Sequence, residues 1–202
     1  MQSTRTKIDS KNTEIRMSTI PNAGSGLFAK KDFAKFDYVC SYEGLAISVE
    51  DANLAVDGSY MLGHTFNNNR TVVIDAIDPN SCYGRYCNDP IDLKKCNILV
   101  TPIKHRLMHN ERWGVIEMLA DKPIKAGDEI FFSYGVNYWM EKPRTNVLST
   151  SQINILIARS KHYKEFIEKH YTFNDLSNKY KEKTKKRPLK PGSKQNPIII
   201  DD

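Results

Sequence analysis

The 202-residue sequence is poor in cysteine, with only four, and none of them forms a C-x-x-C pair. Structural zinc sites draw on such pairs, so we expect no metal site in this chain. Reduced thiols, buried or half-buried, are the expected state of all four, although Cys82 and Cys87 are near enough in sequence to approach each other. The four are Cys40, Cys82, Cys87 and Cys96.

Long apolar runs are also missing. No stretch approaches the roughly 20 apolar residues that a membrane-spanning helix needs, so we expect no membrane interaction. The opening MQSTRTKIDSKNTE lacks the apolar core of a secretory signal, which predicts a protein made and kept inside a cell. A hydrophobic content of 40% with 27% charged residues is typical of one globular domain with short extensions.

Positive charge is concentrated near the end of the chain, in KYKEKTKKRPLKPGSK, and the net charge is +6. This composition predicts a basic, disordered tail over residues 176–202. Its lysines are either simply solvated or attract nucleic acid, nucleosomes or an import receptor. The final PIIIDD resembles a SUMO-interacting pattern, a β-branched run followed by acids, although chance also produces such runs.

Turn residues divide most of the chain into short segments. Residues 1–14 are polar and predict a flexible arm, whereas from Ile15 to about Ile130 short strands alternate with turns. Ser48, with Asp51 three residues later, predicts a helix start. A helical extension is expected over residues 146–175, because apolar residues there recur at helical spacing, and we expect this helix to pack on the core. The sum is a mostly β, α+β domain with few helices.

Four segments contain residues suited to chemistry. Paired glycines, as in NAGSGLFA (residues 22–29), let a backbone approach a ligand closely and offer it N–H groups. Taken singly, each of the four segments is equally typical of an ordinary turn or strand end. The other three are YEG (residues 42–44), GRYCNDP (residues 84–90) and GDEIFFSYG (residues 127–135), which continues into VNYW.

In this order and at these separations, the four segments resemble the motifs of the SET domain family of protein lysine methyltransferases. The resemblance runs from about Ile15 to Trp139, so a SET domain is expected over residues 15–145. YGVNYWMEKPR looks especially like small SET proteins of large DNA viruses. The family fold is a β-clip of small curved sheets, in which the segments around Asn88 and Tyr134 would thread together as a pseudoknot, followed here by the C-terminal helix.

The resemblance implies S-adenosylmethionine as cofactor and assigns residues to it. The glycine loop would lie against its methionine part, Asn88 and the Asp89 backbone would hold its amine and adenine, and Tyr138 or Trp139 would pack on adenine. The implied cofactor-binding residues are Gly24, Ser25, Gly26, Arg85, Asn88, Asp89, Tyr134, Tyr138 and Trp139.

Three residues are implied for catalysis. Tyr134 matches the essential tyrosine of the family, and Tyr42 matches a second tyrosine in the channel for the substrate lysine. Phe132 occupies the position where SET enzymes carry Phe or Tyr, and Phe leaves room for a growing methylammonium. The sequence therefore predicts more than one methyl group added per lysine.

The sequence departs from the family pattern at three places. The family's Asn-His is Asn88-Asp89 here, which is tolerable if only backbone atoms matter and weakens cofactor binding if the imidazole matters. The family's next motif, Cys-x-Pro-Asn, has no clear match in this sequence. Its Asn position corresponds to Lys95, Cys96 or Asn97. No cysteine follows Cys96, so the zinc segment of many chromatin SET enzymes is not expected within this chain.

The resemblance implies a protein-lysine N-methyltransferase acting on a histone tail or another basic protein, as a chromatin regulator in the nucleus, or in the host nucleus if viral. Two alternatives remain open: a catalytically inactive SET module that serves as a chromatin-binding scaffold, and a methyltransferase for a non-histone protein. Some small SET proteins dimerise, so a homodimer is a further expectation.

Overall fold

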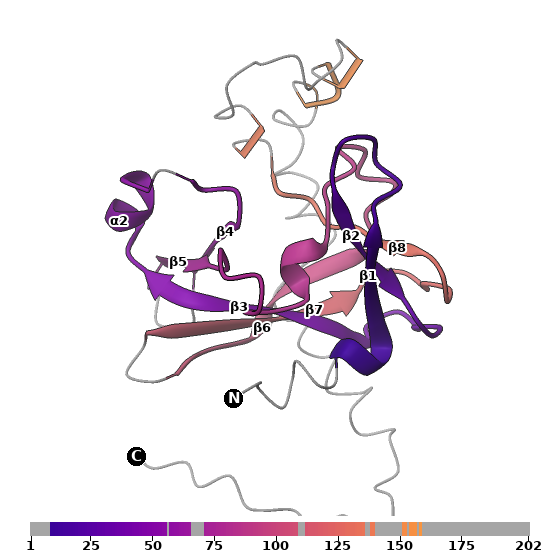
Figure 1. Ribbon diagram of the computed structural model, residues 1–202, viewed down its shortest axis with the longest axis horizontal. Helices are drawn as coiled ribbons and strands as arrows, with labels where there is room; N and C mark the ends of the chain where they lie inside the picture. Colours follow the sequence, from indigo (N-terminus) through magenta and orange to yellow (C-terminus); the bar gives the residue numbers. More distant parts are fainter. Residues whose placement is uncertain are drawn as a thin grey trace, which may run out of the picture.

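The computed structural model describes residues 9–55, 57–65, 71–108, 112–135, 138–139, 151–152, 154–156 and 158, with the side chains of 101–106 excepted. Antiparallel strands dominate these residues and helices are few and short, as predicted (Figure 1). The elements are β1 (Thr13–Met17), β2 (Ser25–Ala29), β3 (Tyr38–Ile47), α2 (Val49–Asn53), β4 (Met61–Thr65), β5 (Thr71–Asp75), the 3-10 helix η1 (Gly84–Tyr86), β6 (Ile98–Met108), β7 (Trp113–Ala120) and β8 (Glu129–Ile130).

The larger sheet has the strand order β4-β5-β3-β7-β6. Its central strand β3 pairs antiparallel with β7 along most of its length and bends where the register shifts between Tyr38 and Cys40. Gly114 in β7 leaves room for the side chain of Ile74 in β5, two strands away, because a Cβ atom on Gly114 would collide with that side chain. The helix α2 follows β3 directly, and the side chain of Ser48 accepts a hydrogen bond from the Asp51 N–H, as predicted for its N-cap.

The smaller sheet has the order β1-β2-β8, so β8, near the end of the domain, lies beside β2, near its beginning. Leu27 of β2 pairs with Ile130 of β8. Directly after β8, Phe131 forms a parallel bridge with Asn88, and the Phe132 N–H donates to the Asn88 carbonyl at 3.2 Å. The segments around Asn88 and Tyr134 therefore run side by side.

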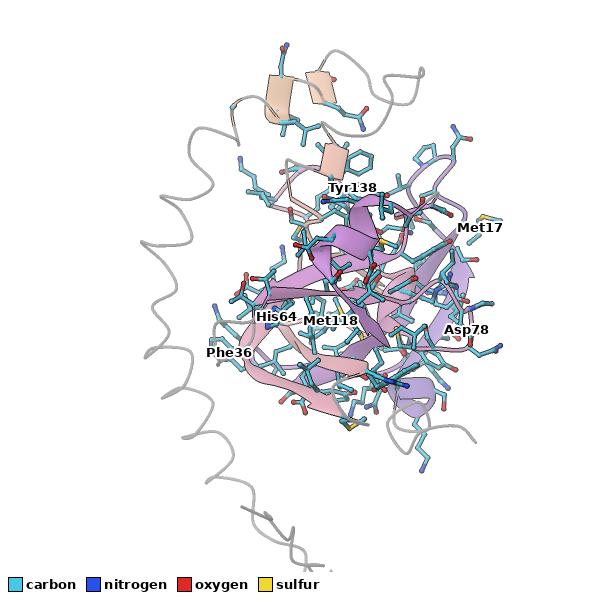
Figure 2. All side chains as sticks on the ribbon, turned by 90° about the vertical axis from the view of Figure 1, so that its left-hand side faces the viewer. Met17, Phe36, His64, Asp78, Met118 and Tyr138 are labelled. Atoms are coloured by element: carbon cyan, nitrogen blue, oxygen red, sulfur yellow. The ribbon has the colours of Figure 1, made fainter. Side chains whose placement is uncertain are left out.

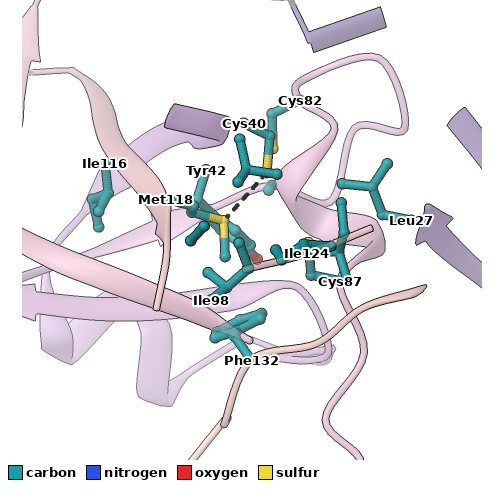
Figure 3. Packing of buried hydrophobic residues seen from close by; sticks show 14 of the residues in the cluster. Leu27, Cys40, Tyr42, Cys82, Cys87, Ile98, Ile116, Met118, Ile124 and Phe132 are labelled. Atoms are coloured by element: carbon teal, nitrogen blue, oxygen red, sulfur yellow. Dashed lines mark hydrogen bonds between the residues drawn. The ribbon is translucent and has the colours of Figure 1, made fainter. Parts of the chain in front are cut away.

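One hydrophobic core joins the two sheets (Figure 3). The Cys40 Sγ lies 3.8 Å from the Met118 Sδ in its centre. All four cysteines are free thiols, three buried and Cys96 half-buried, as predicted. Hydrogen bonding with Cys87 and burial hold the pKa of Cys40 well above its usual value, and burial raises the pKa of Cys82 to about 11. These thiols are therefore unreactive packing groups.

The flexible arm predicted for residues 1–14 is wrong from Asp9 onward. Residues 9–12 form a helical turn, and β1 begins at Thr13. The Asp9 carboxylate is almost fully buried and accepts hydrogen bonds from the Tyr38 hydroxyl at 2.7 Å and the Ser41 N–H at 3.2 Å. Polar composition suggested solvent exposure, but partners distant in sequence satisfy these polar groups inside the fold.

The predicted C-terminal segments are described only in part. Of the helical extension over 146–175, residues 151–152, 154–156 and 158 are helical, and Leu156 is buried. The rest of that extension and the basic tail over 176–202, with its PIIIDD end, lie outside the described residues. In the part of the chain that the structure describes, no helix is long and apolar enough to cross a membrane, and no metal-binding group of His, Cys, Asp or Glu occurs.

Candidate active site

A cavity of about 580 Å³ opens where the loop after β1, the η1 turn and the segment after β8 come together. This volume is in the range of small-molecule sites. Figure 2 shows one of its lining residues, Tyr138, at the upper end of the domain and away from Met118 in the interior. The lining residues are Ile20, Pro21, Asn22, Ala23, Gly24, Ser25, Ser59, Tyr60, Arg85, Tyr86, Asn88, Asp89, Pro90, Ile91, Tyr134, Tyr138, Trp139 and Gln152.

A second, much narrower hollow of about 30 Å³ adjoins this cavity. Four residues line both spaces, so the two share a wall at Ser59, Arg85, Tyr134 and Tyr138. The narrow hollow is largely apolar and aromatic. Its lining residues are Tyr42, Ser59, Met61, Leu62, Arg85, Cys87, Phe132, Tyr134 and Tyr138.

The glycine loop contributes Gly24 and Ser25 to the cavity wall, but not Gly26. Gly24 has φ +71°, which favours glycine, and a Cβ atom built there meets nothing within 4 Å. Gly26 lies in β2, and its Cβ atom would collide with the Glu129 carboxylate. Gly26 is therefore outside the cavity wall, and its lack of a side chain leaves room for the Glu129 carboxylate against the loop.

Glu129 is a residue of the site that the sequence did not single out. Its buried carboxylate accepts hydrogen bonds from the Ser18 hydroxyl at 2.6 Å and the Thr19 N–H at 2.7 Å. The Asn88 Nδ2 reaches the same carboxylate at 3.5 Å and donates to the Ser25 carbonyl at 3.0 Å. Glu129 and Asn88 thus tie the glycine loop to the rest of the cavity wall. The one signal in the sequence that could have pointed to this glutamate is its place in the fourth motif, two residues after Gly127.

Asp89, where the family has histidine, lies almost fully buried in the cavity wall. Its Oδ2 accepts hydrogen bonds from the Tyr134 N–H at 2.8 Å and from the Trp139 indole N–H at 2.9 Å. Its Oδ1 accepts from the Ile91 N–H at 2.7 Å. One side chain therefore connects the η1 turn with the segment that follows β8.

Tyr134 stands at the junction of the cavity and the narrow hollow. Its hydroxyl donates to the Cys87 carbonyl at 2.9 Å. Its ring centroid lies 5.0 Å from that of Phe132, 4.8 Å from Tyr138 and 6.1 Å from Trp139, with which it is stacked at 10°. Burial raises the pKa of Tyr134 well above its usual value, so the phenol remains protonated and acts as a neutral hydrogen-bonding group.

Tyr42 and Phe132 form the inner end of the narrow hollow together with Tyr134. The Tyr42 hydroxyl donates to the Tyr60 carbonyl at 2.6 Å, and burial raises its pKa. The three predicted catalytic residues are thus brought together in one largely apolar space, from two segments distant in sequence: β3 for Tyr42, and the segment after β8 for Phe132 and Tyr134.

Arg85 lines both spaces, but its guanidinium is largely engaged within the protein. The Nε atom donates to the Ala76 carbonyl at 2.8 Å and Nη2 to the Ile77 carbonyl at 3.1 Å. The guanidinium also lies 3.8 Å from the ring centroid of Tyr60. These contacts anchor η1 to the end of β5. Arg85 therefore supports this part of the cavity wall. Its predicted contact with the cofactor stays a prediction.

The structure distinguishes between the three candidates for the Asn position of the family's Cys-x-Pro-Asn motif, and it favours Asn97. Its Nδ2 donates to the Glu129 carbonyl at 2.9 Å, and its Oδ1 accepts from the Phe131 N–H at 2.8 Å. Lys95 is exposed, and Cys96 is half-buried, with its thiol toward the Asp92 carbonyl. Of the three candidates, Asn97 is therefore the one that fixes the strand leading to Tyr134.

Several cavity residues carried no signal in the sequence. Ile20, Tyr60 and Gln152 come from segments with no recognisable motif. They join the wall only because the strands and turns between them fold together, and single-sequence patterns do not encode such long-range placement.

The fold and the site define an antiparallel β protein in which a cavity of cofactor size meets a narrow aromatic pocket at a buried tyrosine. The chain matches the family model of the SET domain over residues 24–135, more than half of its length, and it belongs to the SET domain family. This is a family of protein lysine methyltransferases, whose members generally use S-adenosylmethionine.

Proposed function

We propose that this protein is an S-adenosylmethionine-dependent protein-lysine N-methyltransferase that acts on a histone. The observation that carries this proposal is the common wall of the two spaces at Tyr134. A methyl donor in the cavity and a lysine side chain in the narrow hollow would meet there.

The residues of the cavity suit S-adenosylmethionine in size and chemistry. The volume of about 580 Å³ is sufficient, and the open space beside Gly24 lets a ligand approach the loop backbone. Ser25, Asn88 and the Asp89 backbone supply polar groups, and Tyr138 and Trp139 supply aromatic faces for a purine. When bound, the cofactor supplies a methyl group activated by a positively charged sulfur.

The chain's own residues would prepare the lysine. The walls around Tyr42 and Phe132 are largely apolar. Such surroundings disfavour the ammonium form and would lower the pKa of an inserted lysine. Because Tyr134 donates to the Cys87 carbonyl, its oxygen keeps lone pairs that can accept weak C–H or N–H contacts from the reacting groups. Alignment in the narrow hollow then replaces a dedicated general base.

Multiple methylation is part of the proposal. Phe132 lines the narrow hollow beside Tyr134 and has no hydroxyl to hold a water or an amine there. The space next to the reacting nitrogen is therefore left for added methyl groups.

The partners and the compartment are proposed on indirect grounds. A histone tail as substrate, contact with nucleosomal DNA and a nuclear location are supported by the basic tail and by the family's chemistry. The PIIIDD end supports a SUMO-type partner. A homodimer is proposed by analogy with small SET proteins alone.

One alternative has a specific observation in its favour. Asp89 replaces the family histidine, which is compatible with an inactive SET module that serves as a chromatin scaffold. Tyr134, Tyr42 and Asn88 all keep the family identity and share the site, which favours activity.

The test is incubation of the full chain with labelled S-adenosylmethionine and each core histone separately, together with a basic non-histone protein. We expect label on lysine of one histone, and loss of this label in Tyr134→Phe. Label only on the non-histone protein would replace the histone by another substrate. Absence of both transfer and cofactor binding would favour the scaffold.

A further inference from the structure

The cavity wall depends on an unusual convergence of N–H donors at Asp89. Three donors from separate places point at this buried carboxylate: the Ile91 main chain, the Tyr134 main chain and the Trp139 indole. Its side chain is 5% exposed, so water does not replace these partners readily. Removing an acceptor would leave buried donors unsatisfied, which is costly.

The chemistry of this convergence suits an aspartate. A carboxylate has two oxygens and accepts several hydrogen bonds at once, whereas a neutral imidazole has a single acceptor nitrogen. Hydrogen bonds to a charged acceptor are also stronger than neutral ones. The three donors around Asp89 therefore match the residue present here, and they do not match a histidine at the same place.

Two of the three donors belong to residues that shape the proposed site. Tyr134 forms the wall shared by the cavity and the narrow hollow, and the ring of Trp139 is stacked on that of Tyr134. The third donor, Ile91, has φ +65°, an uncommon conformation for a β-branched residue that the hydrogen bond to Asp89 helps to hold. Asp89 thus holds Tyr134, Trp139 and the turn at Ile91 in fixed positions relative to one another.

We propose that Asp89 is a positioning residue for the methyl transfer, acting by holding Tyr134 and Trp139 in the geometry that receives the cofactor. This inference rests on the proposed function. Under this inference, Asp89 is a functional substitute for the family histidine, and its presence does not indicate a loss of activity.

The experiment uses the full chain with Trp113→Phe as background, so that Trp139 is its one tryptophan. In Asp89→Asn an amide group replaces one of the two acceptor oxygens. Without cofactor, we expect the Trp139 emission to shift to longer wavelength and its quenching by acrylamide to rise. By calorimetry, we expect S-adenosylmethionine to bind about tenfold more weakly.

Asp92→Asn is the matched control. The side chain of the half-buried Asp92 accepts a hydrogen bond from the Lys94 N–H at 3.0 Å within a surface turn, and Asp92 does not line the cavity. It should change neither the emission nor the affinity. Unchanged emission and affinity in Asp89→Asn, or equal changes in Asp92→Asn, would overturn the inference.

Two further outcomes separate this inference from the proposed function. If the unmodified chain binds no S-adenosylmethionine, the proposed function fails, while the emission of Trp139 still decides whether Asp89 positions it. If Asp89→Asn does not fold, Asp89→Glu takes its place, because it keeps both acceptor oxygens and moves them by one methylene relative to the three donors. A loss of cofactor affinity of about threefold or more then supports the inference, and an unchanged affinity contradicts it.

Discussion

At the scale of single residues, buried ionisable groups carry a pH dependence that can be measured. Burial raises the pKa of Asp9 to about 6, an effect that the nearby Glu43 reinforces and that hydrogen bonds from Tyr38 and Ser41 oppose. Between about pH 4 and 6 the native protein keeps a proton that the unfolded chain has released, so stability falls as pH rises.

Asp9→Asn mimics the protonated state and removes this dependence. We expect the free energy of unfolding of the wild type, relative to Asp9→Asn, to fall by on the order of 3 kcal/mol between about pH 4 and pH 7. Urea unfolding at a series of pH values measures it. If the free energies of unfolding of the two proteins changed with pH in parallel, this role of Asp9 would be contradicted.

Asp32→Asn gives a control with the opposite sign. The exposed Asp32 accepts a hydrogen bond from the Lys125 Nζ at 2.7 Å, and this contact lowers the pKa of the carboxyl group. The wild type should therefore gain stability relative to Asp32→Asn as pH rises through the acid range.

If the proposed reaction takes place, we expect Phe132 to set the number of methyl groups added. Phe132→Tyr places a hydroxyl in the narrow hollow, where it can hold a water or the amine and occupy the space of a second methyl group. We expect the products to shift from di- and trimethyllysine to monomethyllysine, with the rate of the first transfer reduced less than tenfold. Mass spectrometry of the modified substrate measures the ratio, and an unchanged ratio would refute this role.

At the scale of elements, Glu129 joins β8 to the loop between β1 and β2. Glu129→Gln leaves one acceptor oxygen for the donors of Ser18 and Thr19, so we expect a loss of about 2 kcal/mol in stability. Amide exchange at Thr19 should become faster at the same time. Asp128→Asn, which alters a carboxylate bonded to the Lys125 N–H in the adjacent turn, should leave Thr19 unchanged. Equal protection of Thr19 in Glu129→Gln would contradict this role.

The sequence predicted those elements whose signals are local. Strand-rich content, the Ser48 cap and the order of the four motifs follow from spacing of a few residues, and the structure confirms the fold class. The resemblance of the motifs to the SET domain family also pointed to Asn88 and Tyr134, and both residues line the cavity.

The remaining features depend on contacts between distant segments. Asp9 was assigned to a loose arm, because nothing local shows that Tyr38 and Ser41 would enclose it. Glu129 lies more than a hundred residues from Ser18, and its role emerges only when β2 pairs with β8. Local patterns within a single sequence do not reveal such contacts between distant residues.

At the scale of the whole molecule, two sheets and a shared core serve to bring three chain segments to one cavity. The glycine loop, the η1 turn and the segment after β8 each contribute part of the wall. The parallel bridge between Asn88 and Phe131 fixes two of them to each other. The arrangement leaves the cavity and the narrow hollow in contact at Tyr134. The central claim of the proposed mechanism is that S-adenosylmethionine binds in the cavity, against the glycine loop.

The most direct test of that claim is titration calorimetry of S-adenosylmethionine into the wild type, Gly24→Ala and Gly127→Ala. Both glycines have positive φ and open space around a Cβ atom, but only Gly24 lines the cavity. We predict binding by the wild type, about tenfold weaker binding by Gly24→Ala and wild-type affinity for Gly127→Ala. Absence of binding by the wild type, or equal losses in the two variants, would contradict the account.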